Sequence, residues 1–91
     1  MDVRSILGLL APTTVGAHAK LNQYRNRVGI VVPLERATIH RWYARESMPS
    51  KWLQVAGIAV LEEHGPAGFA RFAAAMLDLE EVELGEFAVT P

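Results

Sequence analysis

The sequence contains no cysteine, which excludes a disulfide framework and removes the thiolate ligands of most structural zinc sites. It also lacks an apolar run near the roughly 18 residues that cross a bilayer, and it has no glycine-rich loop for phosphates. The three histidines show no metal-ligand spacing, and no serine has the context of a catalytic nucleophile. We therefore expect no metal, no cofactor, no enzymatic activity and no membrane span.

Apolar residues are abundant, at 51% of 91 residues, and their spacing is mostly helical. Strand signals are weak, because only residues 30–32 form a β-branched run, and it is short. We predict an all-α fold, a compact bundle of about five helices in a single domain over residues 1–81. Residues 82–91 are expected to be an acidic, mobile tail.

The expected helices are separated by proline and glycine. The first covers residues 3–10, the second begins near Val15 behind a threonine cap, and the third covers residues 34–45. A fourth begins near Pro49, and the Gly65-Pro66 pair divides it from a fifth. The end of the second helix stays open: it ends at Gly29, or it continues through residues 30–32 to Pro33.

Charge is distributed unevenly although the net charge is only −1. Residues 20–51 hold seven lysines and arginines against two glutamates, whereas residues 52–91 hold one arginine against seven acidic residues. A domain divided in this way can place a positive face on DNA while its other side remains acidic. Uneven charge is also common in small domains without such a function.

The third predicted helix has the pattern of a DNA-reading element. Its buried side would carry Ile39, Trp42 and Glu46 at about 100° per residue, and the opposite side would face solvent. On that open side and its flanks lie side chains suited to base edges or to thymine methyl groups, namely Arg36, Ala37, Thr38, His40 and Arg41. His40 has two interpretations, a groove contact or an inert exposed residue. Basic residues near helix ends are expected to contact phosphates instead, namely Arg25, Arg27, Arg45 and Lys51.

The segment ERATIHRWYARESMPSKW resembles the recognition helix and following loop of Cro and phage-repressor helix-turn-helix regulators. Ile39, Trp42, the basic Arg41 and Arg45, and Met48-Pro49 carry the resemblance, which extends over residues 28–58. It implies a lambda-repressor-like fold and a cytoplasmic, nucleoid-associated transcriptional regulator, such as a repressor, that binds duplex DNA. Two positions depart from the pattern: Gly29 stands where an alanine is usual, and Pro33 stands where a glycine is usual. Since proline cannot adopt positive φ, either the turn is longer and begins at Gly29, or the first motif helix is displaced.

Two further questions concern the second half of the chain. The fifth predicted helix either folds back as ordinary core or pairs with a second copy through Phe69, Phe72, Met76 and Leu77. A homodimer would match a palindromic operator. The rival function is that of a protein-binding adaptor, antitoxin-like or a phage inhibitor, in which the acidic half, including Glu80, Glu81 and Glu83, binds a basic partner.

Overall fold

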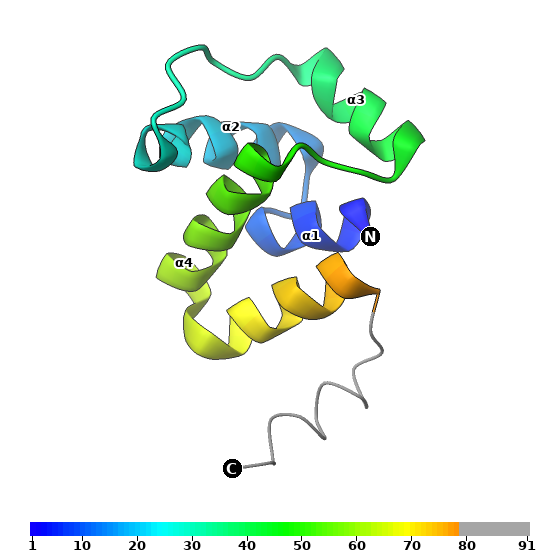
Figure 1. The fold of residues 1–91 in the computed structure, drawn as a ribbon, viewed down its shortest axis with the longest axis vertical. Helices are drawn as coiled ribbons and strands as arrows, with labels where there is room; N and C mark the ends of the chain where they lie inside the picture. The colour runs from blue at the N-terminus through cyan, green and yellow to red at the C-terminus, as the bar shows by residue number, and fades with distance from the viewer. Residues whose placement is uncertain (79–91) are drawn as a thin grey trace.

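The computed structural model describes residues 1–78, which form four α-helices and one 3-10 turn and contain no strand (Figure 1). The all-α prediction is confirmed. The expected count of about five helices is not, because the fourth and fifth predicted helices form one kinked helix. The expected tail, residues 82–91, lies outside the described residues. The elements are α1 (Val3–Leu10), α2 (Thr14–Tyr24), η1 (Arg25–Val28), α3 (Arg36–Arg45) and α4 (Ser50–Leu77).

Side-chain caps fix the starts of the first two helices. The Asp2 carboxylate accepts a hydrogen bond from the Ser5 amide at 3.1 Å, and the Thr13 hydroxyl accepts one from the Gly16 amide at 3.0 Å. Each cap satisfies a backbone donor that has no partner within its helix. The threonine cap predicted before the second helix is therefore Thr13.

Helix α4 bends sharply at Gly65, whose φ of 70° and ψ of −166° are not helical. This conformation is accessible to glycine, and Pro66 directly after it has no backbone N–H to continue the helical ladder. The bend divides α4 into residues 50–64 and 66–77, which we call its first and second arms. The second arm returns along α1 (Figure 1), and the Asp2 amide donates a hydrogen bond to the Ala75 carbonyl at 2.8 Å.

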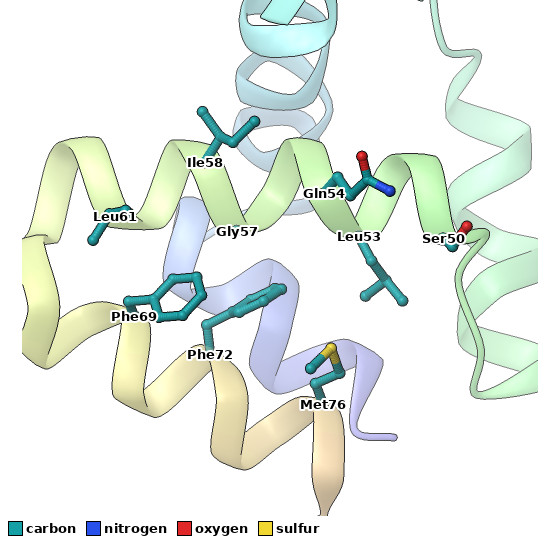
Figure 2. A pocket seen from close by; sticks show the side chains of 9 residues that line it. All are labelled: Ser50, Leu53, Gln54, Gly57, Ile58, Leu61, Phe69, Phe72 and Met76. Atoms are coloured by element: carbon teal, nitrogen blue, oxygen red, sulfur yellow. The ribbon is translucent and has the colours of Figure 1, made fainter. Parts of the chain in front are cut away.

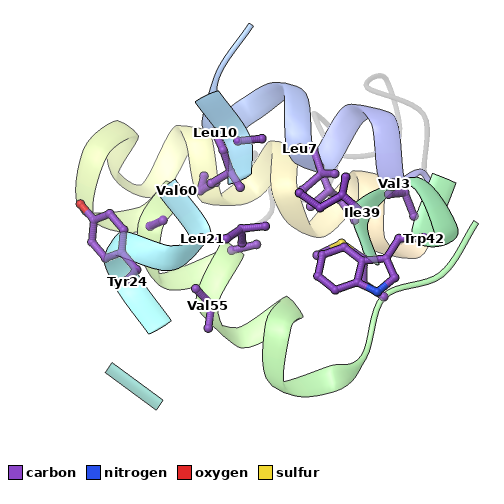
Figure 3. Packing of buried hydrophobic residues seen from close by; sticks show 14 of the residues in the cluster. Val3, Leu7, Leu10, Leu21, Tyr24, Ile39, Trp42, Val55 and Val60 are labelled. Carbon is purple, nitrogen blue, oxygen red and sulfur yellow. The ribbon is translucent and has the colours of Figure 1, made fainter. Parts of the chain in front are cut away.

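The buried side chains form one cluster to which all four helices contribute (Figure 3). Its fully buried members come from every helix, namely Ile6, Leu7, Leu21, Ile39, Val55 and Val60. The apolar residues of α1 at i, i+3, i+4 and i+7 share one face of the helix, and all four are buried against the other helices. Small residues on α4, Gly57 among them, let the second arm approach the first.

Polar contacts join α2 and η1 to the first arm of α4. Glu63 accepts from the Lys20 ammonium at 2.7 Å and from the Tyr24 hydroxyl at 2.9 Å. The Arg27 guanidinium pairs with Glu62 at 2.9 Å. These contacts occupy two of the acidic side chains that the sequence places in the acidic half of the chain.

The hydrogen bond from Lys20, followed by that from Tyr24, lowers the pKa of Glu63 below its ordinary value of 4.5. Because the folded state holds the proton less tightly than the unfolded chain, this pair stabilises the fold above pH 4.5 and loses its effect as the pH falls through the folded pKa. We expect Glu63→Gln to lower the free energy of unfolding at pH 7 and to matter progressively less in acid. Urea unfolding at several pH values measures this, with Glu35→Gln as the control; a difference independent of pH would contradict it.

Candidate nucleic-acid interface

Helix α3 begins at Arg36, two residues later than the predicted start at residue 34. The reason is that the backbone of Leu34 forms hydrogen bonds with side chains of α2 instead of taking part in α3. Its amide donates to the Asn22 side-chain oxygen at 2.7 Å, and its carbonyl accepts from the Asn22 amide at 3.2 Å. The His18 ring nitrogen also lies 2.6 Å from that carbonyl. Asn22 and His18, which we call the Leu34 clamp, therefore set where α3 starts.

The inner face of α3 is anchored by two apolar side chains. Ile39 is 0% exposed, and Trp42 is 5% exposed with its ring centroid 6.2 Å from that of Trp52. Both residues are buried as the helical spacing predicts. Glu46, expected on the same side, is exposed instead, because the helix ends there in a left-handed conformation with φ of 51°. The Glu46 prediction was wrong because it extended the helical spacing past the last residue of the helix.

The outer face of α3 presents the side chains that the sequence proposed for base contact. Arg36, Ala37, His40 and Arg41 are exposed, as is Arg45 in the last turn, while Thr38 at the flank is half-buried. Within residues 1–78, none of the three arginines of α3 forms an ion pair, in contrast to Lys20 and Arg27. The outer face of α3 therefore carries guanidinium groups that form no ion pair within residues 1–78, on a helix that is held in place by its buried inner face.

The connection between α2 and α3 is longer than the tight turn of a helix-turn-helix. The chain passes through η1, turns at Gly29 with φ of 76°, and then forms a loop, residues 29–35, before α3 (Figure 1). Residues 30–32 are therefore not helical, and the second predicted helix corresponds to α2 and η1 together. Pro33 left two possibilities, a longer turn that begins at Gly29 or a displaced first helix. The structure has the longer turn that begins at Gly29.

Three of the residues expected to contact phosphates are engaged within the fold. The Arg25 guanidinium donates to the carbonyls of Ile30 at 3.0 Å and Val31 at 2.6 Å. Arg27 pairs with Glu62, and its guanidinium lies 5.5 Å from the centre of the Tyr24 ring. The Lys51 ammonium lies 3.4 Å from the Val28 carbonyl. Of these, Arg25 has the clearest structural role, because it holds the backbone of the 29–35 loop.

One cation beside α3 was missed by the sequence analysis. Arg4 on α1 lies over the Tyr43 ring of α3, with its guanidinium carbon 4.6 Å from the ring centre. The Tyr43 hydroxyl in turn lies 3.2 Å from that of Thr14 at the start of α2. Arg4 is exposed and adds positive charge at the flank of α3. Nothing in the local sequence near residue 4 could have placed it there, since its position depends on how α1 packs.

The predicted dimer residues are not equally accessible. The second arm folds back on its own domain and buries Phe72, which is 4% exposed, so Phe72 belongs to the core and not to a free interface. Phe69 is 39% exposed, Met76 is half-buried and Leu77 is exposed. Between the two arms lies an apolar groove of about 480 Å³ (Figure 2), with walls that include Leu53, Ile58, Leu61, Phe69, Phe72 and Met76.

Within residues 1–78, no helix has the length and apolar character needed to cross a membrane, and no group of three or more histidine, aspartate or glutamate side chains could hold a metal ion. Comparisons with protein-family models, with curated proteins and with solved structures found no match to this chain.

Proposed function

We propose that this protein binds duplex DNA in a sequence-specific way through the outer face of α3, as a transcriptional regulator of the phage or prophage type. The observation that carries the proposal is the division of α3 into two faces. Ile39 and Trp42 fix the helix to the core, while Arg36 and Arg41 extend from it without an ion partner among residues 1–78. Guanidinium groups of this kind bind guanine O6 and N7 in the major groove.

The roles follow from position on the helix. Arg36, His40 and Arg41 would read base edges, and Ala37 is small enough to meet a thymine methyl group. Arg45 at the end of α3 and Arg4 beside Tyr43 would contact phosphates, which position the protein without reading sequence. Lys51 would add a phosphate contact only by giving up its long hydrogen bond to Val28.

The rival adaptor function gains no support from the described acidic residues. In residues 52–78 the three acidic side chains are each engaged: Glu62 with Arg27, Glu63 with Lys20, and Asp78 with the N-terminal ammonium of Met1. Glu80, Glu81 and Glu83 lie outside the described residues. Within residues 1–78, the charged side chains without an ion partner on the outer face of α3 are arginines, with Glu35 and Glu46 exposed at the two ends of the helix.

We further propose that the protein binds as a homodimer, since one short recognition helix reads too few base pairs for useful affinity. Phe69 and Leu77, with Leu61 near the elbow of α4, supply exposed apolar side chains for a contact between copies. Phe72 would support this contact from beneath by filling the space under Phe69, whose ring centroid is 5.6 Å away.

Selection from a random duplex pool tests the function directly. We expect one palindromic sequence to be enriched, and its affinity to fall linearly with salt on a logarithmic scale, because phosphate contacts release counterions. With three to five phosphate contacts in the complex, the slope of log affinity against log salt concentration would be about −3 to −5. Fluorescence anisotropy at several salt concentrations measures it. No enriched sequence, or an affinity independent of salt, would contradict the proposal.

A further inference from the structure

The loop between Gly29 and α3 exposes two adjacent valines. Val31 is 82% exposed and Val32 is 75% exposed, the largest values among the exposed large hydrophobic residues of the described chain. Neighbouring residues behave differently, since Ile30 packs against the core and Leu34 is buried. Residues 31–33 therefore form an exposed stretch between two packed residues, Ile30 and Leu34.

This exposure is not the result of a loosely attached loop. Before the valines, Arg25 donates two hydrogen bonds to the carbonyls of Ile30 and Val31, at 3.0 and 2.6 Å. After them, the Leu34 clamp fixes the backbone amide and carbonyl of Leu34 from α2. Pro33 restricts the chain further, because its ring fixes φ. Both ends of the segment are held, and the two valines are presented in a defined orientation.

The valines lie beside the proposed DNA-reading face. The loop and α3 follow each other along one edge of the molecule, away from the elbow of α4 (Figure 1). Val32 precedes Arg36 by four residues, so the chain keeps the two within about 14 Å of each other. If a duplex binds to the outer face of α3, the loop would therefore lie near the base pairs that flank those contacted by α3.

We propose that Val31 and Val32 form a second DNA-contact surface, which packs against the C5-methyl groups of thymines flanking the bases read by α3. The inference rests on the proposed function. Two side chains are too few for the core of a protein interface, which needs about 800 Å² from each partner. A thymine methyl group, by contrast, is the apolar feature of the major groove and needs only one or two apolar side chains.

The test combines a change in the protein with a change in the DNA. In the enriched duplex, each thymine is replaced by deoxyuridine, which removes only the methyl group. The protein variants are Val31→Ser and Val32→Ser, which remove both γ-methyl groups of the valine at exposed positions. We expect wild type to lose about fourfold in affinity at one or two thymines, and the serine variants to lose less at those positions. Val15→Ser, at an exposed valine on α2 that has no part in the proposed DNA or dimer contacts, is the matched control and should respond as wild type does.

The outcomes separate the two proposals. A wild type that binds no duplex removes the proposed function and this inference together. A wild type that binds, but responds to deoxyuridine as the serine variants do, removes this inference alone. Variants that change the oligomeric state in sedimentation without changing the response to deoxyuridine also overturn it, because the valines then contact protein. Circular dichroism confirms that each variant is folded.

Discussion

Reversing the charge of Arg41 and Arg45 is expected to abolish sequence-specific DNA binding and leave the fold intact. Both side chains are exposed on α3, and neither has an ion partner among residues 1–78 that would be lost on substitution. Loss of one bidentate base contact costs about 1–3 kcal/mol, and a glutamate facing phosphates adds repulsion. Arg41→Glu with Arg45→Glu should therefore weaken binding to the selected duplex by at least about 100-fold.

If α3 reads DNA, the loss must come from the position of Arg41 and Arg45 on α3 and not from the change in net charge. Arg71→Glu is the matched control for the single variant Arg41→Glu, because Arg71 is exposed on the second arm of α4 and changes net charge by the same amount. Anisotropy titrations of both single variants at one salt concentration provide the comparison. Equal losses would mean that only the overall charge matters, which would contradict a reading surface on α3. The adaptor hypothesis predicts instead that changes at Glu80, Glu81 and Glu83 abolish activity.

The part of the fold that the sequence predicts is the part governed by local spacing. Apolar residues at i, i+3, i+4 and i+7 predict α1 and the buried face of α3, where Ile39 and Trp42 are indeed buried. Glycine followed by proline also predicts the position of the interruption at Gly65, although the sequence predicts two separate helices there and the structure has one kinked helix. These features depend on residues within one or two helical turns.

The features that the sequence could not predict depend on contacts between distant segments. The start of α3 is decided by Asn22, twelve residues before Leu34, and no periodicity reports that hydrogen bond. Arg25 was assigned to phosphates because it is basic, yet the 29–35 loop uses it for two backbone carbonyls. Phe72 has the same local spacing in a dimer helix and in a helix that folds back, so only the packing of the second arm decides between them.

The candidate site follows from this division of charges. Lys20 and Arg27 neutralise the acidic side chains of α4, and Arg25 supports the loop, so those three basic residues serve the fold. The arginines of α3 have no such partner among residues 1–78, and Arg4 lies next to them over Tyr43. The +5 excess of residues 20–51 is therefore larger than the charge that DNA would meet. For this reason we expect a moderate salt dependence and a larger role for base contacts.

Trp42→Ala is expected to destabilise the whole domain, because this side chain joins α3 to the core. Trp42 is 5% exposed and packs against Trp52, and truncation of a buried tryptophan costs about 3–5 kcal/mol. A small domain has a total stability of about 5–15 kcal/mol, so the variant should be largely unfolded or close to it.

Urea unfolding followed by far-UV circular dichroism measures the loss, with Trp42→Phe as the variant that keeps an aromatic ring in the core. Trp52→Ala provides the comparison at a half-buried tryptophan and should cost less. A loss below about 1 kcal/mol for Trp42→Ala would mean that α3 is attached by Ile39 and the Leu34 clamp alone. The rigid presentation of Arg36 and Arg41, on which the proposed sequence-specific binding depends, would then need another physical basis.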